Sequence, residues 1–284
     1  MEPSFTKINI KKRLIKKKKK LFIALATLVA GLSLAACSSG EKAQTPLEKI
    51  KEKGTLVVAT SPDYAPFEFQ TLVDGANKVV GSDIMLAQKI ADELGVKLEV
   101  STMNFDNVLN SVKNGKADLA IAGLSVSPER SKIFDFSEPY YQVGNVLLVQ
   151  KADADKVATV ADLDQLDLAV QKGTTQETYA RESLSNANII SLTLMGEAVN
   201  ELKNGQVKAI LLDSAVAEGY ISQNPDLAIA ALSFEAEEEN AKAIAMPKDS
   251  GDLKTEIDKI IVEIVESGEY NTYLEEAAKY TVVE

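Results

Sequence analysis

The chain has 284 residues, with 31 basic and 42 acidic side chains and a formal net charge of −11 at pH 7. It contains no histidine and a single cysteine. These counts exclude an internal disulfide, histidine-based catalytic triads and most zinc sites, and the acidic balance argues against a nucleic-acid partner. We therefore expect no metal and no cofactor, and a stability that comes from burial of a hydrophobic core.

The N-terminal 36 residues have the pattern of a secretion signal. Nine of the residues at 7–20 are Lys or Arg, and an apolar run of 16 residues follows at 21–36, shorter than the roughly 20 residues of a spanning helix. The run ends in Leu-Ala-Ala-Cys at 34–37, which resembles a lipobox, so we expect residues 1–36 to be removed and Cys37 to be lipidated. An ordinary secretory signal and a basic tail are the alternatives.

The segment at 37–45 is expected to be the lipidated cysteine and a flexible tether of small polar residues. Without residues 1–36 the chain keeps 22 basic and 41 acidic residues. Such a surface repels anionic headgroups, so the lipid on Cys37 would be the only attachment to the membrane.

The next residues show helix and strand signals in alternation. Thr-Pro-Leu-Glu at 45–48 has the spacing of a capping box with proline in the first turn, which predicts a helix start. A strand is expected at 56–60, a helix at 84–94 that ends at Gly95, and a strand at 97–102. Alternation of this kind predicts an α/β fold with largely parallel sheets.

The most informative local pattern surrounds Gly123, where a buried apolar strand is expected to end. Ser125 follows, and then Ser127 and Pro128 begin a helix that carries Arg130. Open α/β sheets bind ligands beyond the carboxyl ends of their strands, and an arginine fork suits a planar carboxylate. The pattern indicates a carboxylate site at Arg130, with a helix cap followed by a solvated arginine as the alternative.

A helix–glycine–strand unit occurs twice, 90 residues apart. Residues 105–119 align with 195–209, and Lys-Asn-Gly at 113–115 recurs at 203–205. In each copy an amphipathic helix is expected to end at the glycine, and a buried strand follows. Polar residues come after each strand: Gly123 and Ser125 in the first copy, Asp213 and Ser214 in the second. This repetition favours two related lobes that each contribute half a site, with chance similarity as the alternative.

Several short motifs occur in a fixed order between about Thr55 and Tyr280. Besides the segment 118–141, they are Ser-Pro-Asp-Tyr-Ala-Pro-Phe-Glu-Phe at 61–69, Val-Gly-Ser-Asp-Ile at 80–84, Asn-Phe-Asp at 104–106, Gly-Thr-Thr-Gln at 173–176 and Leu-Asp-Ser at 212–214. Each alone is a weak signal. Together they resemble the family 3 bacterial extracellular solute-binding proteins, the amino-acid-binding subunits of ABC importers.

The resemblance implies a two-lobed, periplasmic-binding-protein-like (type II) fold whose hinge consists of two crossover segments. Residues 46–141 and 242–284 would form lobe 1, and residues 145–238 would form lobe 2. The crossings would lie near 142–144 and 239–241, and the lobes would close around ligand.

The function that the resemblance implies is capture of an amino acid for an ABC importer. A permease and its ATPase would be the partners. The protein would act as a monomer, held by its lipid on the extracytoplasmic side of the cell membrane.

Burying the charges of an α-amino acid is unfavourable unless each has a partner. We expect Arg130 to bind the carboxylate, together with the backbone N–H groups of Ser125 and of Thr175, which begins a helix. We expect Asp213 to bind the ammonium, with the Gly123 carbonyl and the Ser125 hydroxyl as further acceptors. The alternative for Asp213 is a cap of the helix that follows it.

The resemblance also places Tyr64, Phe67 and Phe105 at the aromatic positions around the ligand's side chain, with core packing as the alternative for each. We expect Tyr64 in the site and Phe67 in the scaffold, while Phe105 suits either role. Asp63 and Glu68 are candidates to meet a cationic side chain, or are solvated loop charges. Arginine or lysine is therefore the expected ligand, and a neutral polar amino acid such as glutamine is the second choice.

Two other functions are compatible with this fold. An enzyme similar to cyclohexadienyl dehydratase would need a general acid or base in the cleft, for which Asp213 is the candidate. A ligand-sensing module would need a separate membrane receptor. We expect a binding protein and no enzyme, because the chain lacks histidine, a second cysteine and a glycine-rich phosphate loop.

Overall fold

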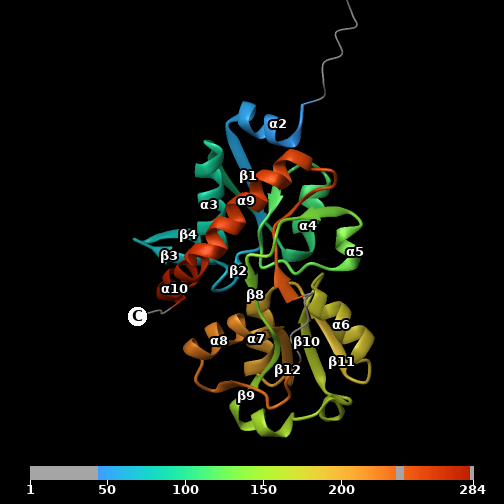
Figure 1. Ribbon diagram of the computed structural model, residues 1–284. Helices are drawn as coiled ribbons and strands as arrows, with labels where there is room; N and C mark the ends of the chain where they lie inside the picture. Colours follow the sequence, from blue (N-terminus) through green and yellow to red (C-terminus); the bar gives the residue numbers. More distant parts are fainter. Residues whose placement is uncertain (1–43, 235–239, 282–284) are drawn as a thin grey trace, which may run out of the picture. The chain divides into compact units, whose positions relative to one another are not determined.

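The computed structural model describes residues 44–234 and 240–281. The expected signal peptide, Cys37 and most of the tether lie outside these residues. Two five-stranded sheets form the centres of two lobes (Figure 1). Within the described residues, no helix combines the length and the apolar character that crossing a bilayer requires.

The first sheet belongs to the upper lobe of Figure 1. Its strands, in spatial order, are β5 (Lys97–Thr102), β1 (Thr55–Thr60), β6 (Leu119–Ala120), β15 (Ala245–Pro247) and β7 (Phe134–Phe136). β1 pairs in parallel with β5 and β6, as the alternation of strands and helices predicts. β15 runs antiparallel to β6 and β7. The chain reaches β15 without a crossover helix, which a parallel pairing would require.

The second sheet has a similar mixture of directions. Its strands, in spatial order, are β11 (Asn188–Leu192), β10 (Asp167–Gln171), β12 (Ala209–Asp213), β9 (Asn145–Gln150) and β13 (Leu227–Ile229). β10 is parallel to β11 and β12. β9, where the chain enters this lobe, runs antiparallel to β12 and β13. The expectation of largely parallel sheets therefore holds for β5, β1 and β6 and for β11, β10 and β12.

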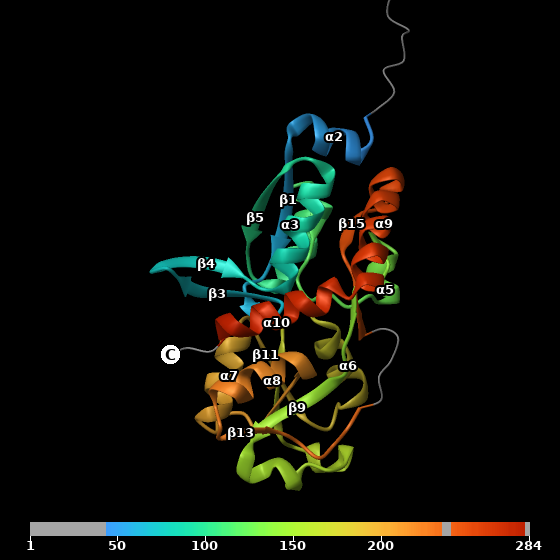
Figure 2. The ribbon, with the colours of Figure 1, turned by 60° about the vertical axis from the view of Figure 1, so that its left-hand side comes forward.

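Helices pack on both sheets. On the first sheet they are α2 (Pro46–Lys53), α3 (Ser82–Leu94), α4 (Phe105–Lys113) and the single turn α5 (Pro128–Ser131). On the second they are α6 (Thr175–Ser183), α7 (Met195–Lys203) and α8 (Ser214–Gln223), with short 3₁₀ turns η1 (Lys151–Lys156) and η2 (Val160–Leu163). The last helices are α9 (Gly251–Ser267) and α10 (Glu269–Thr281). α10 packs on α3 and also contacts α8 of the second lobe (Figure 2).

The local signals read from the sequence form as expected. Thr45 and Glu48 make a reciprocal capping box at the start of α2, and α3 ends at Gly95. The repeated unit is also present, since α4 and α7 each have nine residues and begin 90 residues apart. The glycines after them, Gly115 and Gly205, both have left-handed φ, of 66° and 73°.

Two short strands connect the lobes. β8 (Tyr141–Gln142) and β14 (Ala241–Lys242) pair antiparallel, with Lys242 opposite Tyr141. An isolated bridge also joins Lys242 to Ser125. These strands lie close to both expected hinge segments, although residue 239 is outside the described part of the chain.

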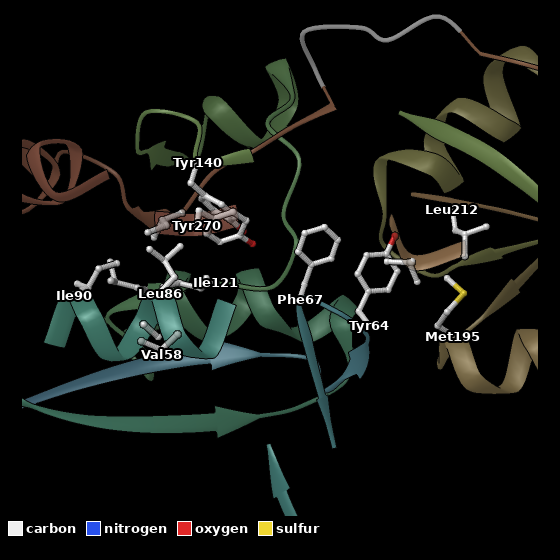
Figure 3. Close-up of a cluster of buried hydrophobic side chains, with 14 of the residues drawn as sticks. Val58, Tyr64, Phe67, Leu86, Ile90, Ile121, Tyr140, Met195, Leu212 and Tyr270 are labelled. Carbon is white, nitrogen blue, oxygen red and sulfur yellow. The ribbon is translucent and has the colours of Figure 1, made fainter. Parts of the chain in front are cut away.

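Apolar side chains from both lobes form one continuous cluster. Figure 3 shows Tyr64 and Phe67 between the aliphatic residues of the first lobe and Met195 and Leu212 of the second. The Tyr64 and Phe67 rings stack with centroids 6.0 Å apart. Burial of this cluster favours the arrangement in which the two lobes contact each other.

Two carboxyl groups, those of Glu68 and Asp83, are fully buried in the first lobe. Asp83, on α3, accepts hydrogen bonds from the Gly123 N–H at 2.8 Å, the Tyr140 hydroxyl at 2.9 Å and the Tyr270 hydroxyl at 2.7 Å. Three donors favour the ionised form of Asp83 even though burial raises its pKa. Burial raises the pKa of Glu68 well above its ordinary range, and the Asp83 carboxylate raises it further. Glu68 is therefore the member of the pair that holds its proton to a higher pH than a solvent-exposed glutamate does.

The start of α3 lies very close to a neighbouring loop. A three-stranded antiparallel unit, β2 (Asp63–Tyr64), β3 (Glu68–Val73) and β4 (Ala76–Val80), leads into Gly81, which has a φ of 135°. A Cβ atom at Gly81 would lie 2.0 Å from the carbonyl oxygen of Phe67. Only glycine fits this position without movement of the backbone.

Replacing Gly81 with alanine should therefore lower the free energy of unfolding by more than about 2 kcal/mol, because the new Cβ displaces backbone. Urea unfolding followed by circular dichroism measures the change. Gly196→Ala is the matched control: it lies in α7 with no atom within 4 Å of the added Cβ, and should gain about 0.5–1 kcal/mol. Equal stability of the two variants would contradict the steric argument.

Glu68→Gln should stabilise the protein more at pH 8 than at pH 5. Glu68 has a higher pKa in the folded state than in the unfolded chain. The folded state thus binds the extra proton above about pH 4.3, and the stability of the wild type falls as pH rises from there towards the folded pKa. Each unit of pKa difference corresponds to about 1.4 kcal/mol.

Glutamine does not titrate, so the stability of the variant does not fall with rising pH through this group. Urea unfolding at the two pH values measures the difference, and Glu129→Gln, whose side chain is 73% exposed, is the control. A Glu68→Gln effect that is the same at both pH values would show that Glu68 is ionised in the folded protein.

Candidate functional site

A small cavity lies between the two lobes, where the carboxyl ends of strands from both sheets meet. Its lining residues are Tyr64, Phe105, Gly123, Ser125, Arg130, Gln171, Thr174, Thr175, Gln176, Asp213 and Lys242. The cavity has a volume of about 10 Å³, roughly the room for one water molecule. The lobes are therefore closed on each other. Seven of the eight ligand-binding residues expected from the sequence line this cavity, and Asp63 does not.

Asp213 is the most buried charged group of the cavity. It is the last residue of β12, and its exposed fraction is 0%. Its carboxylate accepts hydrogen bonds from the Tyr64 hydroxyl at 2.9 Å and from Gln176 Nε2 at 3.0 Å, and pairs with Lys242 Nζ at 2.6 Å. Asp213 is also the residue before α8, but its side chain makes no capping hydrogen bond. The alternative of a simple helix cap is therefore wrong.

Arg130 reaches the cavity from the opposite lobe. Ser127 caps the one-turn helix α5, so the local alternative of a Ser-Pro cap is also present. The guanidinium donates to the Ser125 carbonyl at 2.5 Å and, across the lobes, to the Gly173 carbonyl at 3.0 Å. A guanidinium has five N–H donors, so these two bonds leave others for a ligand. Burial lowers the pKa of Arg130 to about 10, which keeps it cationic at neutral pH.

The N-terminus of α6 forms another wall. Thr174 caps this helix by accepting the Glu177 N–H at 3.1 Å. Thr175 is the first helical residue, and the first N–H groups of a helix have no intrahelical acceptor. This geometry suits an anion at Thr175, as the sequence predicts.

Of the three aromatic residues considered in the sequence analysis, Tyr64 and Phe105 line the cavity and Phe67 lies in the hydrophobic core. Tyr64 lines the cavity and holds Asp213 through its hydroxyl. Phe67 is fully buried in the core and is absent from the cavity lining. Phe105 lines the cavity, and the guanidinium carbon of Arg130 lies 5.8 Å from its ring centroid. Phe105 thus contributes a cation–π contact that positions Arg130.

The two acidic candidates for side-chain selectivity do not line the cavity. Asp63 accepts hydrogen bonds from the Met195 N–H at 2.8 Å and from Gln171 Nε2 at 3.2 Å. It therefore joins the lobes, and burial raises its pKa. Glu68 belongs to the buried carboxyl pair with Asp83. Neither side chain lines the cavity in this structure, and contact of Asp63 or Glu68 with a ligand stays a prediction.

Four lining residues were not expected from the sequence: Gln171, Thr174, Gln176 and Lys242. Gln171 ends β10 after an apolar run, so the rule that identified Asp213 could have found it. Gln176 and Thr174 belong to the Gly-Thr-Thr-Gln motif at 173–176. Lys242 has a weaker signal, a single lysine among alanines at the hinge. Within residues 44–234 and 240–281, no cluster of acidic residues could hold a metal ion.

Comparison with known proteins extends these observations. The family model described as bacterial extracellular solute-binding proteins, family 3, matches residues 56–278. The arginine-binding extracellular protein ArtP of Bacillus subtilis is 33% identical over 258 residues, which cover 88% of this chain and 94% of that protein. A cyclohexadienyl dehydratase of Pseudomonas aeruginosa is 29% identical over 210 residues, 73% of this chain and 77% of the enzyme.

Solved structures give a closer match. The crystal structure of AbpA, an amino acid ABC transporter substrate-binding protein from Streptococcus pneumoniae bound to L-arginine, has a TM-score of 0.81 and 51% identity. The match covers 84% of this chain and all of that one. The two-lobed type II fold expected from the motifs is confirmed by these structures. The protein therefore belongs to family 3 of the bacterial extracellular solute-binding proteins.

Proposed function

We propose that this protein captures an amino acid between its lobes and delivers it to the permease of an ABC importer. The observation that carries the proposal is the placement of Arg130 and Asp213, from different lobes, around one cavity. A guanidinium and a carboxylate match the two charges of an α-amino acid, and each would otherwise be costly to bury. The relatives that bind amino acids support the same function.

The ligand's carboxylate would bind Arg130 and the N-terminus of α6. Arg130 and Thr175 both line the cavity, and the helix dipole of α6 adds a favourable potential for an anion. The N–H of Ser125 would complete the site. The fork geometry of arginine makes it better suited to this role than lysine.

The ligand's ammonium would bind Asp213. The Ser125 hydroxyl, which is buried beside Asp213, is a second acceptor, and the Gly123 carbonyl is a third. These groups come from the ends of β12 and β6, so the ammonium would lie between the lobes.

Arginine is the ligand that we propose, with lysine and glutamine as the next candidates. ArtP and AbpA, which are arginine binders by name or structure, support arginine. An extended cationic side chain needs an anion at its far end, and Asp63 pairs with the lining residue Gln171. If the Gln171 side chain moved aside, the ligand's guanidinium could extend from the cavity and pair with Asp63.

Ligand capture would proceed by closure of the hinge. A ligand that pairs with Arg130 on one lobe and Asp213 on the other binds the closed form better than the open form, so it shifts the population towards closure. β8 and β14 are the segments that would bend. The closed form would then dock on the permease, whose ATPase drives uptake.

We also propose that Cys37 carries a lipid that anchors the protein on the extracytoplasmic side of the membrane. The lipobox-like Leu-Ala-Ala-Cys at 34–37, after a charged and then apolar segment, supports this assignment. Stable attachment needs more than one acyl chain, which a diacylated cysteine supplies.

Catalysis is the second candidate, because one relative is a dehydratase. Such an enzyme needs a general acid or base in the cleft. Asp213 is engaged by Tyr64, Gln176 and Lys242, an arrangement that holds its side chain in one position and suits an ion pair with an ammonium. The binding function is therefore preferred.

Isothermal titration of the purified protein with arginine, lysine, glutamine, histidine and cystine tests the proposal. We expect arginine to bind with a Kd at least tenfold below that of the other four. Preference for a neutral amino acid would retain the importer function and reject arginine. Absence of binding by all twenty common amino acids and cystine would reject amino-acid capture.

Arg130→Ala should raise the Kd for arginine at least tenfold, because loss of one partner of a buried charge pair costs about 2–5 kcal/mol. The matched control is Arg181→Ala, since Arg181 is 52% exposed on α6 and pairs with Glu177. Thermal unfolding should show that both variants fold. An unchanged Kd in Arg130→Ala would remove this residue from the carboxylate site.

A further inference from the structure

Lys242 is a buried cation in the lining of the cavity. The side chains of Lys242 and Asp213 are each only 1% exposed, and Nζ lies 2.6 Å from the Asp213 carboxylate. Nζ also donates to the Ser125 hydroxyl at 2.9 Å. A lysine ammonium is buried at this depth only when it is paired.

The partners of Lys242 are those that an amino acid's ammonium requires. Both cations are –NH₃⁺ groups with three donors and no acceptor. Asp213 and Ser125 are also the acceptors assigned above to the ligand. One carboxylate oxygen, Oδ2 of Asp213, already accepts from both Lys242 and Tyr64, and Gln176 donates to the other oxygen. Lys242 is the only cation among these three partners, so it holds the place on Asp213 that a ligand's ammonium would take.

We propose that Lys242 occupies the ammonium subsite and that ligand binding is an exchange, in which the ligand's ammonium replaces Lys242 at Asp213. This inference rests on the proposed amino-acid function. It makes Lys242 a specificity-determining residue, because the lysine competes with every ligand that carries an α-amino group.

The charges of the cavity require such an exchange for a cationic ligand. Arg130 and Lys242 are two cations, and Asp213 is the one anion among the lining residues. An added ammonium beside Lys242 would place two like charges on one carboxylate, which is unfavourable where water is excluded. Departure of Lys242 relieves the repulsion.

The structure allows Lys242 to move without disruption of the fold. Its backbone is fixed in β14 by pairing with Tyr141 of β8 and by the bridge to Ser125. The flexible four-carbon stem can carry Nζ away while that backbone stays paired. Since β14 lies where the chain passes between the lobes, opening of the hinge offers the lysine a route to solvent.

Exchange has a consequence for ligands that lack an amine. In the wild type, Lys242 can remain on Asp213 when the ligand brings no ammonium, so the carboxylate keeps its partner. Without Lys242, such a ligand would leave the buried Asp213 carboxylate without a cation, with hydrogen bonds from Tyr64 and Gln176 alone, which is unfavourable. Lys242 should therefore reduce the discrimination between an amino acid and its deamino analogue.

The test compares L-arginine with 5-guanidinopentanoate, which is arginine without its α-amino group, in the wild type and in Lys242→Met. Isothermal titration gives the ratio of the two Kd values for each protein. We expect arginine to bind Lys242→Met at least several-fold more tightly than the wild type. We expect the ratio of the analogue's Kd to that of arginine to rise at least tenfold.

Lys248→Met is the matched control. Lys248 is another lysine of the same segment, pairs with Asp135 and is 47% exposed, so neither the arginine affinity nor the ratio should change. If Lys242→Met does not fold, Lys242→Gln replaces it, because the amide keeps a neutral donor for Asp213.

Three outcomes are informative, and each rejects a different assignment: the exchange at Lys242, arginine as the ligand, or amino-acid capture itself. A ratio within twofold of the wild type, or weaker binding of arginine by the folded Lys242 variant, rejects the exchange and makes Lys242 a permanent structural partner of Asp213. Failure of the wild type to bind arginine rejects the arginine assignment instead, and the ratio is then measured with the amino acid that binds and its own deamino acid. If no amino acid binds, both the proposed function and the exchange are rejected.

Discussion

The closed arrangement depends on the satisfaction of one buried carboxylate, that of Asp213. Removing an ionised carboxylate from water costs several kcal/mol unless donors replace the solvent. Here the donors come from three separate segments, Tyr64 on β2, Gln176 on α6 and Lys242 on β14. None of these segments is adjacent to β12 in the sequence. The carboxylate therefore constrains the relative position of both lobes and of the strand pair that connects them.

The polar lining of the cavity is explained by a property of parallel α/β sheets that both lobes share. In parallel α/β sheets, the carboxyl ends of the strands and the helix starts that follow them present unpaired backbone groups and polar side chains. Ser125 comes after β6, Gln171 ends β10 and Asp213 ends β12. Two lobes whose strand ends face each other thus bring complementary polar groups together. The repeated helix–glycine–strand unit explains why each lobe presents such an edge.

Much of this could be predicted from the sequence because the signals are local. The capping box at Thr45, the stop at Gly95 and the 90-residue repeat each depend on residues a few positions apart. Asp213 was identified because a carboxylate at the end of a buried apolar run needs a partner. Arg130 was identified because it follows a strand end at a helix start, in a segment that resembles the family signature. The expected limits of the lobes stay predictions.

Other features depend on contacts that no local pattern encodes. Lys242 was missed because its acceptor Ser125 lies 117 positions away, and β14 is too short to reveal which way its side chains point. The bond between Asp63 and Met195, which spans 132 positions, was missed for the same reason. Antiparallel strands β9 and β15 likewise escaped a pattern based on strand–helix alternation, since their register is set by tertiary packing.

The bond between Asp63 and Gln171 has a consequence for how this protein could change over evolutionary time. Arg130 and Asp213 suit the α-carboxylate and the α-ammonium, which all α-amino acids share. The hydrogen bonds that hold these two residues do not involve the side chains of Gln171 and Asp63. Under the proposed function, substitutions at the Asp63–Gln171 pair would alter which side chain is accepted and would keep the charge-pairing network. A change of ligand would then need substitutions at this pair and would leave in place the groups that bind the ligand's two α-charges.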